Sequence, residues 1–528
     1  MLLSDALYSA NQVRELDRCA IEEYDVPGIV LMKRAGRSAF KVLLEHWPQV
    51  NALQIFCGGG NNGGDGYVIA ALAAQKGLPV TVWQLSDELK GDAKLAHDFA
   101  LQEGVSISSF QHDIFQSYLD NTHSPGVIVD ALLGIGCIGD LRSPYAEVIG
   151  SINQSGWPVL SIDVPSGVNS DNGVVSSVAV KAYATISFIG QKLGNLIGQG
   201  RICSGQRFFD DLDVSVDVYF KFQQKEGPQE TSAASKLNLS ALLERLPIRS
   251  LDAHKGDSGH LLVVGGDYGF GGAPLMAAEM AARAGAGLVG VVTQPVNTTA
   301  IIARRPELMA VGVSSGQEFL PLLDKPSVLV VGPGLGQSAW SEQLFYHCLH
   351  ADKPMVLDAD ALNLLASGRL VLPTTSQHIS TPHPGEAARL LSMSIEQVQS
   401  DRIAAVTALQ ERLGGAVVLK GAGSLVMTSA KQLFVCDAGN PAMASGGMGD
   451  VLSGLLGALL AQGMSIDEAA CLGVILHSTA ADIAVAETQM SGLLATDLID
   501  YVRLLLGGEL GGELGGEYVS DGWADIDG

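Results

Sequence analysis

Short apolar runs rich in β-branched residues recur along both halves of this 528-residue chain. They do not alternate with polar residues, which is typical of parallel strands buried on both faces of a sheet. In the first half the runs are Leu53–Cys57, Val80–Leu85, Val127–Val129 and Val159–Ile162. In the second half they are Leu261–Val264, Leu288–Val292, Val328–Val331, Met355–Leu357 and Ala416–Leu419. Helix-like segments separate the runs, so the sequence predicts two three-layer α/β domains.

Residues 222–236 are polar, contain Gly and Pro, and have no apolar period, which predicts a linker. We therefore place one domain at residues 1–221 and the other at residues 237–506. From residue 507 onward a Gly-Gly-Glu repeat leads into an acidic end. Residues 507–528 have too little apolar surface to fold, so we predict a disordered acidic, Gly-rich tail.

The composition narrows the class of protein. Hydrophobic residues make up 47% and charged residues 17% of the chain, which permits large cores. The net charge of -24 argues against a nucleic-acid partner. Seven cysteines lie singly, without a C-x-x-C pair, and indicate reduced thiols rather than disulfides or zinc. Neither a signal peptide nor roughly 18 uninterrupted apolar residues are found, so we expect a cytoplasmic protein that does not bind membranes.

A glycine-rich motif in the first half suggests a bound nucleotide. Gly58-Gly-Gly60-Asn-Asn-Gly63 matches G-x-G-x-x-G, follows a predicted strand and precedes a predicted helix. Asp87 or Glu88 lies near the end of the next strand, where a ribose-binding acid belongs. An NAD-dependent dehydrogenase is therefore one alternative. Asp65 counts against it, because its carboxylate would lie in the first helical turn, where a pyrophosphate should bind.

Two further predicted strands in this half end in polar groups. Asp130 precedes Gly134-Ile135-Gly136, and Asp163 precedes Ser166. The carboxyl ends of parallel strands line the ligand crevice of an open sheet, so Asn62, Asp130 and Ser166 are expected to converge. A single Asp after a strand is more often a helix cap. Three such groups, each beside glycine, favour a site.

These motifs resemble those of the NAD(P)H-hydrate epimerase domain. The resemblance implies a potassium ion bound by Asn62, Asp130 and Ser166, with Asp163 as the residue that moves a proton at the hydrated nicotinamide ring. The substrate-binding residues that it implies are Asn61, Asn62, Gly63, Gly64, Asp65, Gly134, Ile135, Gly136, Cys137, Ile138, Gly139, Asp140 and Asp163. Ile135 departs from the pattern, because many members have threonine there.

In the second half, the glycine-rich stretch from Gly439 to Gly454 leads into an apolar helix predicted from Val451 to Leu460. The free N–H groups and positive dipole end of a helix start can bind an anion. Asp450 lies at this start, and a carboxylate beside an anion site can take a proton from a hydroxyl during phosphoryl transfer. The alternative is that Asp450 only caps the helix.

Other loops of this half carry groups suited to a nucleotide. Gly334 lies in a Gly-Pro-Gly-Leu-Gly turn after a predicted strand, His383 lies between two prolines, and Lys420 is followed by Gly-Ala-Gly-Ser. No G-x-x-x-x-G-K-[ST] motif occurs, so these loops would have to bind the phosphates. Taken alone, His383 could be structural and Lys420 an ordinary surface lysine.

Together these motifs resemble the ADP-dependent NAD(P)H-hydrate dehydratases, which are ribokinase-like. The resemblance implies Mg²⁺ and ADP as phosphoryl donor. Substrate contacts are implied at Ala273, Gly334, His383 and Asp450, and nucleotide contacts at Lys420, Gly421, Ala422, Gly423, Ser424 and Gly449.

The two resemblances imply one bifunctional repair enzyme. The first domain would interconvert the R and S hydrates of NADH and NADPH (NADHX and NADPHX). The second would dehydrate the S hydrate by phosphorylating its ring hydroxyl and eliminating phosphate. The family also implies a homo-oligomer. The alternative is a ribokinase-like kinase for a vitamin alcohol, with a non-catalytic nucleotide-binding module in front.

Overall fold

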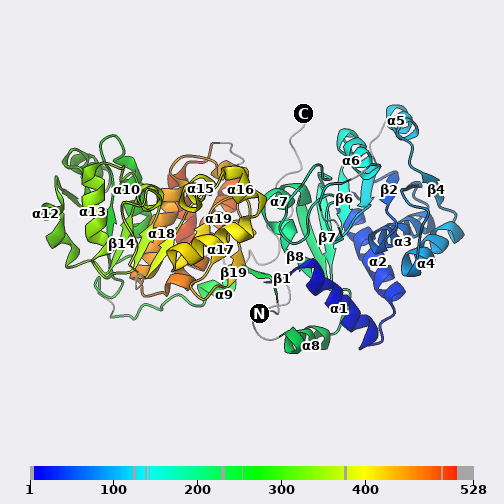
Figure 1. Ribbon diagram of the computed structural model, residues 1–528, viewed down its shortest axis with the longest axis horizontal. Coiled ribbons are helices and arrows are strands. Elements are labelled where there is room, and N and C mark those ends of the chain that lie inside the picture. Colours follow the sequence, from blue (N-terminus) through cyan, green and yellow to red (C-terminus); the bar gives the residue numbers. More distant parts are fainter. Residues whose placement is uncertain are drawn as a thin grey trace. The chain divides into compact units, whose positions relative to one another are not determined.

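The computed structural model describes residues 5–122, 126–136, 139–141, 143–226, 232–252, 254–373, 377–488 and 492–507. The chain divides into two compact units, Met1–Ser235 and Lys236–Gly528. Helices flank a largely parallel sheet in each unit, which confirms the predicted α/β fold class (Figure 1). Apart from Gly507, the predicted tail lies outside the described residues.

The N-terminal unit contains a parallel sheet with the strand order β4-β3-β2-β5-β6-β7-β9. Its strands are β2 (Leu53–Cys57), β3 (Val80–Gln84), β4 (Ser106–Ser109), β5 (Val127–Ala131), β6 (Val159–Ile162), β7 (Ala184–Phe188) and β9 (Gln206–Asp210). The chain runs outward from β2 through β3 to β4, then returns to β5 on the other side of β2. This reversal makes the carboxyl ends of β2 and β5 the switch point at which such sheets bind ligands.

The helices of this unit are α1 (Ala10–Glu22), α2 (Gly28–His46), α3 (Asn61–Gln75), α4 (Gly91–Gln102), α5 (His112–Asn121), α6 (Tyr145–Gln154), α7 (Gly198–Ser204) and α8 (Val216–Glu226). Two short strands, β1 (Ala6–Tyr8) and β8 (Gln191–Lys192), pair in parallel.

The linker predicted at residues 222–236 has regular structure at both ends, which corrects that expectation. Residues up to Glu226 complete α8, and β10 (Ala234–Lys236) pairs antiparallel with β1 through Ser235 and Ala234. Phe222 is only 3% exposed and packs in the N-terminal core together with Val218. Apolar residues four apart bury one helix face, and this signal outweighs the polar composition of the stretch.

The C-terminal unit has the strand order β13-β12-β11-β14-β15-β16-β17-β18-β19. The strands are β11 (His260–Val264), β12 (Leu288–Thr293), β13 (Met309–Gly312), β14 (Val328–Val331), β15 (Met355–Leu357), β16 (His378–Ser380), β17 (Ala416–Leu419), β18 (Leu425–Met427) and β19 (Leu433–Val435). Pairing is parallel from β13 to β17 and antiparallel from β17 to β19. All of the strands predicted in this half are present.

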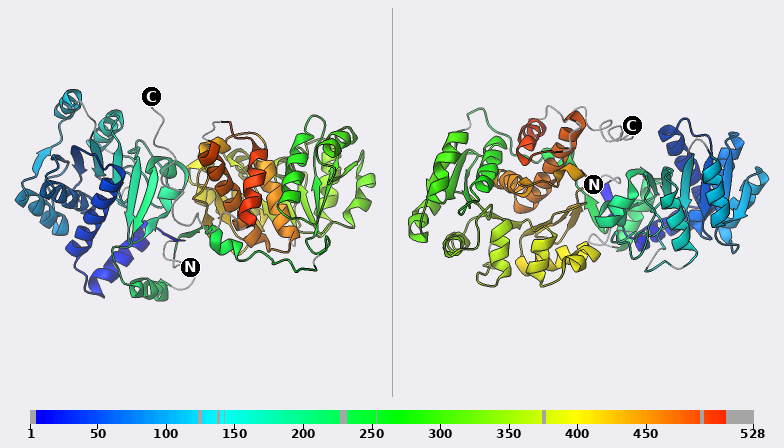
Figure 2. Two further views of the ribbon diagram at one scale, coloured as in Figure 1. Left: turned by 180° about the vertical axis from the view of Figure 1, so that it is seen from behind. Right: turned by 90° about the horizontal axis from the view of Figure 1, so that it is seen from above.

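The helices of this unit are α9 (Leu239–Leu243), α10 (Gly272–Arg283), α11 (Thr298–Arg304), α12 (Gly316–Phe319), α13 (Ala339–Leu349), α14 (Ala359–Ala366), α15 (Pro384–Leu391), α16 (Ile395–Ser400), α17 (Arg402–Leu413), α18 (Met448–Ala461), α19 (Ile466–Thr488) and α20 (Leu498–Leu506). Figure 2 shows α18 to α20, coloured orange to red, packed side by side. By length and composition α19 could cross a membrane, but 72% of its apolar window is buried in the unit. It is a core helix here.

Glycines let α18 approach its neighbours closely enough to place its first turn. A Cβ atom at Gly454 would lie 2.0 Å from the carbonyl oxygen of Ala277 in α10. One turn later, a Cβ at Gly457 would lie 2.5 Å from Cγ2 of Val330 in β14. Backbone contact therefore fixes the distance of α18 from both the sheet and α10.

We predict that Gly454→Ala destabilises the C-terminal unit by about 1–3 kcal/mol, because overpacking against a backbone carbonyl cannot be relieved by a side-chain rotation. Urea unfolding measures this change. Gly150→Ala in α6 is the control, since a Cβ there meets nothing within 4 Å and alanine favours a helix by about 1 kcal/mol. Equal effects of the two substitutions would contradict the packing argument.

Candidate active sites

In the N-terminal unit, the loops after β2 and β5 touch backbone to backbone. A Cβ at Gly58 would lie 2.0 Å from the carbonyl oxygen of Leu132, and one at Gly63 would lie 2.0 Å from that of Gly58. Only glycine permits these contacts, and α3 begins immediately afterwards at Asn61. The start of α3 thus lies at the switch point of the sheet, where its dipole favours a negatively charged ligand.

Asp130 and Ser166 are in direct contact, as the sequence predicted. The Ser166 hydroxyl donates to Asp130 Oδ1 at 2.6 Å, and the Ser166 N–H donates to Oδ2 at 2.9 Å. The Ser161 hydroxyl also donates to Oδ2, at 2.8 Å. Burial raises the pKa of Asp130 despite these hydrogen bonds, because the carboxylate has no exposure to water. A nearby cation would stabilise its charged form.

Asn62 lies beside the loop that follows Asp130. Its Oδ1 atom would be 3.5 Å from a Cβ built on Gly134, and both Oδ1 and Nδ2 are buried without a hydrogen-bond partner. Leaving such groups unpaired costs about 1–3 kcal/mol each, so an unpaired buried amide indicates a missing ligand. The oxygens of Asn62, Asp130 and Ser166 are the donor type that a hard cation prefers.

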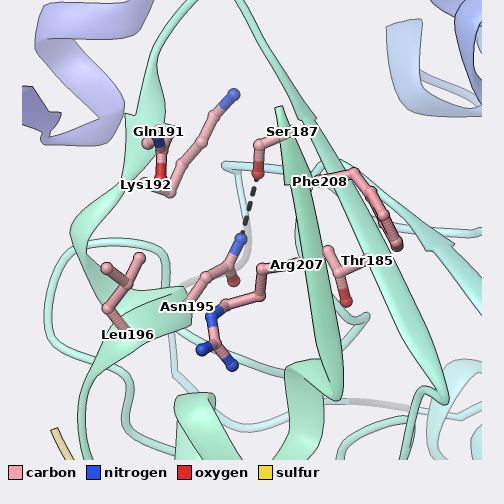
Figure 3. A pocket seen from close by; sticks show the side chains of 8 residues that line it. All are labelled: Thr185, Ser187, Gln191, Lys192, Asn195, Leu196, Arg207 and Phe208. Carbon is pink, nitrogen blue, oxygen red and sulfur yellow. Dashed lines mark hydrogen bonds between the residues drawn. The ribbon is translucent and has the colours of Figure 1, made fainter. Parts of the chain in front are cut away.

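Asp163 is held rigidly behind this loop region. Its backbone has φ 68°, in the left-handed region, and its carbonyl oxygen accepts hydrogen bonds from Ser187 Oγ at 2.7 Å and Asn195 Nδ2 at 2.9 Å. Figure 3 shows the Asn195 amide directed at the Ser187 hydroxyl, 3.1 Å away. The carboxylate forms an ion pair with the buried Lys192. Strained backbone held by several contacts is typical of functional positions.

Two more carboxyl groups interact with Asp163. Burial, Asp163 and Asp17 raise the pKa of Asp65 well above its usual value. Burial raises the pKa of Asp17 to about 6, with Lys192 opposing and Asp163 reinforcing the shift. Asp17 was not predicted. Asp17 lies four residues after the buried Val13 and three before the buried Ala20, so it is on the apolar face of α1. An acidic residue on the apolar face of a helix is the sequence pattern that could have identified it as a candidate site residue.

The other predicted residues of this site lie on the same loops. Asn61, Gly63 and Gly64 belong to the first turn of α3, and Gly134 to Gly136 follow β5. Gly139 and Asp140 lie further along this loop, whereas Cys137 and Ile138 fall outside the described residues.

In the C-terminal unit, Asp450 lies in the first turn of α18 but is not its cap. The cap position belongs to Gly447, which has φ 92° and no side chain to offer. Burial raises the pKa of Asp450 to about 7, Asp358 and Asp360 add to the shift, and Lys420 opposes it. A carboxyl group with a pKa near neutrality, at the start of a helix, is suited to general-base chemistry.

Lys420 is not an ordinary surface lysine. Its ammonium donates to Asp358 Oδ1 at 2.8 Å and lies 4.0 Å from Glu386 Oε2. Burial would raise the pKa of Asp358, but Lys420 and hydrogen bonds from Thr381 and Ser453 hold it below the usual value. A Cβ at Gly449 would lie 3.2 Å from both Asp358 Oδ2 and Lys420 Nζ. The structure therefore brings the Lys420 turn to the start of α18.

His383 has a structural role that sequence reasoning left open. It caps α15, since its Nδ1 accepts from the Gly385 N–H at 3.0 Å and its own N–H donates to Glu386 Oε2 at 2.8 Å. Its side chain is nevertheless 49% exposed. At another strand end, a Cβ on Gly334 would lie 3.2 Å from that of Ala273, so these two predicted contact residues are neighbours.

Magnesium has no ready-made protein cage here. Among the residues that the structure describes, no group of three His, Cys, Asp or Glu side chains is arranged to bind a metal ion. Mg²⁺ commonly binds through one or two carboxylates plus substrate phosphates, and Asp358, Asp360 and Asp450 lie close enough to interact electrostatically. A magnesium ion here would therefore depend on nucleotide phosphates for most of its ligands.

The fold and these residues define a two-domain α/β protein, with one candidate site at the switch point of the N-terminal sheet and another at the start of α18. The family described as YjeF-related protein N-terminus matches residues 28–194, and the family described as NAD(P)H-hydrate dehydratase matches residues 261–504. The chain belongs to the family of bifunctional NAD(P)H-hydrate repair enzymes, as the following relatives show.

A bifunctional NAD(P)H-hydrate repair enzyme of Coxiella burnetii is 45% identical over 503 residues, covering 95% of this chain and 99% of the relative. A bifunctional NAD(P)H-hydrate repair enzyme of Vibrio cholerae is 41% identical over 508 residues, which covers 96% of this chain and 99% of the relative. A crystal structure of a ribokinase-like superfamily protein from Enterococcus faecalis is 31% identical, with a TM-score of 0.48. The match covers 52% of this chain and 95% of the Enterococcus faecalis chain.

We predict that Asp450→Asn stabilises the C-terminal unit at pH 8 but hardly at pH 4. The folded-state pKa of about 7 lies above the ordinary 3.8, so between these values the folded state binds a proton that the unfolded state has lost. Stability therefore falls as the pH rises through this window. Because asparagine does not ionise, the Asp450→Asn variant does not lose this stability as the pH rises. Urea unfolding at both pH values measures the difference, and an equal gain at pH 4 and pH 8 would contradict this account.

Proposed function

We propose that this protein repairs hydrated NADH and NADPH with two separate active sites. The N-terminal site interconverts the R and S hydrates. The C-terminal site dehydrates the S hydrate at the expense of ADP. Family membership supports the pairing of the two activities, and the observation that carries the proposal is the carboxyl group of Asp450, with its pKa of about 7, at the start of α18.

In the C-terminal site, Asp450 takes the proton from the ring hydroxyl of the bound hydrate. The hydroxyl oxygen then forms a bond to the terminal phosphorus of ADP, and AMP leaves with the electrons of the broken P–O bond. The start of α18 stabilises negative charge that develops on the phosphoryl oxygens. Burial raises the pKa of Asp450 to about 7, and a carboxyl group with a pKa near the working pH is suited to act as a general base.

Elimination then restores the nicotinamide ring. Hydroxide is a poor leaving group, whereas phosphate leaves readily with the electrons of the C–O bond. A proton leaves the neighbouring ring carbon, and the carbon–carbon double bond re-forms. The products are NADH or NADPH, AMP and phosphate. Mg²⁺, bound largely through the nucleotide phosphates near Asp358 and Asp360, would supply further charge neutralisation.

In the N-terminal site, inversion requires one bond to the hydroxyl-bearing carbon to break and to re-form on the other face. One group must accept a proton and another must return it. Asp163 is paired with the Lys192 ammonium, whereas burial and the nearby carboxyl groups raise the pKa of Asp65 well above its usual value. A carboxylate paired with a cation and a buried carboxyl group with a raised pKa are suited to these two roles.

Potassium would be bound by Asn62, Asp130 and Ser166. It would offset the charge of Asp130 and satisfy the unpaired amide oxygen of Asn62. The glycine loops after β2 and β5 would then be ordered around the substrate pyrophosphate.

We expect the two activities to be lost separately. Wild-type protein with ADP and Mg²⁺ should convert a mixed R/S hydrate of NADH completely, as followed by absorbance near 340 nm. Asp450→Asn should abolish dehydration and leave epimerisation intact, because only the C-terminal base is removed. Asp163→Asn should slow R-to-S conversion by about 100-fold, as expected for a general acid–base residue, and leave S-hydrate turnover unchanged.

Joint loss of both activities in either folded variant would contradict the two-site proposal. The alternative, a kinase for a vitamin alcohol, predicts phosphorylation of a small alcohol and no recovery of absorbance with either ADP or ATP.

Potassium dependence tests the N-terminal site independently. Epimerisation should fall when K⁺ is replaced by Li⁺, because the smaller ion suits a different coordination distance. Asn62→Ala should lower the K⁺-supported rate about tenfold and remove most of the difference between the ions. Chiral chromatography of the hydrates measures both rates. A K⁺ effect of undiminished size in Asn62→Ala would show that Asn62 is not a ligand.

A further inference from the structure

A buried arginine lies behind the turn from Lys420 to Ser424. Arg402, the first residue of α17, is 2% exposed. Its Nη2 atom lies 3.1, 3.3 and 3.5 Å from the carbonyl oxygens of Leu419, Lys420 and Gly423. Its Nη1 atom donates to Gln399 Oε1 at 2.8 Å. One carbonyl group at the end of β17 and two carbonyl groups of the turn therefore point at a single guanidinium.

This arrangement determines where the N–H groups of the turn point. In a trans peptide unit the C=O and N–H bonds are antiparallel. Because the carbonyls of Lys420 and Gly423 face Arg402, the N–H groups of Gly421 and Ser424 face the opposite side of the turn, where the Gly421 N–H donates to Ser424 Oγ at 3.3 Å. Backbone N–H and hydroxyl groups gathered on one side of a turn can bind an anion.

The contact with Arg402 also bears on the first glycine of the turn. Gly421 has φ 141°, and a Cβ there would lie 2.9 Å from Arg402 Nη1. Gly423 has φ 67°. A side chain at Gly421 would push the guanidinium away from the carbonyl groups that it binds. Gly421 therefore leaves room for a buried residue about twenty positions earlier in the chain, whereas Gly423 is favoured by its own positive φ.

Within the part of the chain that the structure describes, Arg402 forms no ion pair with a carboxylate, so its positive charge is not neutralised there. Lys420 is paired with Asp358 at 2.8 Å, whereas the hydrogen-bond acceptors around Arg402 are neutral carbonyl and amide oxygens. Burial lowers the pKa of Arg402 to about 10, so the guanidinium remains protonated at neutral pH. A charge buried behind the turn attracts an anion more strongly than an exposed one, because water screens it less.

We propose that Arg402 is the positioning residue of the nucleotide site: it holds the Lys420–Ser424 turn with its N–H groups directed at the phosphates of ADP. The inference rests on the proposed function, which assigns the nucleotide to this turn. Arg402 itself is buried on the far side of the turn and does not touch the nucleotide.

Two substitutions, Arg402→Met and Arg402→Lys, test this role, because each should change the KM for ADP and leave the KM for the S hydrate nearly unchanged. In Arg402→Met the KM for ADP should rise about tenfold, since hydrogen bonds from a charged donor are lost and the turn relaxes. In Arg402→Lys the rise should be smaller, because the charge remains but the planar donor fork is lost. The KM for the S hydrate should stay within about twofold of wild type in both variants, since the hydrate does not contact the turn.

Leu409→Ala is the matched control. Leu409 lies in the same helix and is fully buried, so truncation lowers the stability of the unit without touching the turn. Its melting temperature should fall while its KM for ADP stays at the wild-type value. An unchanged KM for ADP in both arginine variants, or an equal rise in Leu409→Ala, would overturn the inference.

Direct binding separates this inference from the proposed function. If wild-type protein shows no ADP-dependent dehydration, the proposed function fails. Calorimetric titration with ADP and Mg²⁺ then decides the role of Arg402 alone. Weaker binding by Arg402→Lys than by wild type and Leu409→Ala supports the inference, and equal binding contradicts it. Arg402→Lys keeps the buried cation, so it also serves if Arg402→Met does not fold.

Discussion

In both units, parallel backbone pairing brings strand ends that are far apart in the sequence to one edge of a sheet. In the N-terminal unit Asp130 pairs in register with Phe56 on one side and Ser161 on the other, so the loops after β2, β5 and β6 must meet. In the C-terminal unit the consecutive pairing of β15, β16 and β17 carries Asp358 and Lys420 into contact. The candidate sites exist because this pairing is regular and all of these strands end on the same side.

The two sites share an electrostatic arrangement, although they lie in different folds. Each has a lysine that neutralises one carboxylate: the buried Lys192 pairs with Asp163, and the partly buried Lys420 pairs with Asp358. Each also has a carboxyl group that forms no ion pair within the described part of the chain and whose pKa burial raises, namely Asp65 and Asp450. Such a group costs stability when it ionises. Buried carboxyl groups with raised pKa values at strand or helix ends are typical of candidate functional sites.

Much of the fold and part of each site could be predicted from the sequence. Continuous β-branched runs located the buried parallel strands, because both faces of these strands are covered and no polar alternation remains. Less regular strands such as β7 and β18 were not predicted. The polar composition of residues 222–236 gave no sign of the helix and strand at their two ends. The burial of Phe222 and the strand pairing of Ser235 decide the structure there. The sequence also left open whether Asp450 caps its helix. Asp450 lies in the first turn of α18, and Gly447 occupies the cap position.

The sequence by itself determined the two-domain α/β organisation and the glycine-rich loops at strand ends, since periodicity and glycine spacing act over a few residues. Only the tertiary structure decided which polar groups pair across the loops. The contact of Asp130 with Ser166, the approach of Asp17 to Asp163 and the position of Arg402 behind Lys420 all join distant segments. Burial and long-range hydrogen bonding have no local pattern. Burial raises the pKa of Asp65, Asp130 and Asp450, and hydrogen bonds from Arg402 fix the direction of peptide groups in the Lys420–Ser424 turn, and neither effect can be read from neighbouring residues in the sequence.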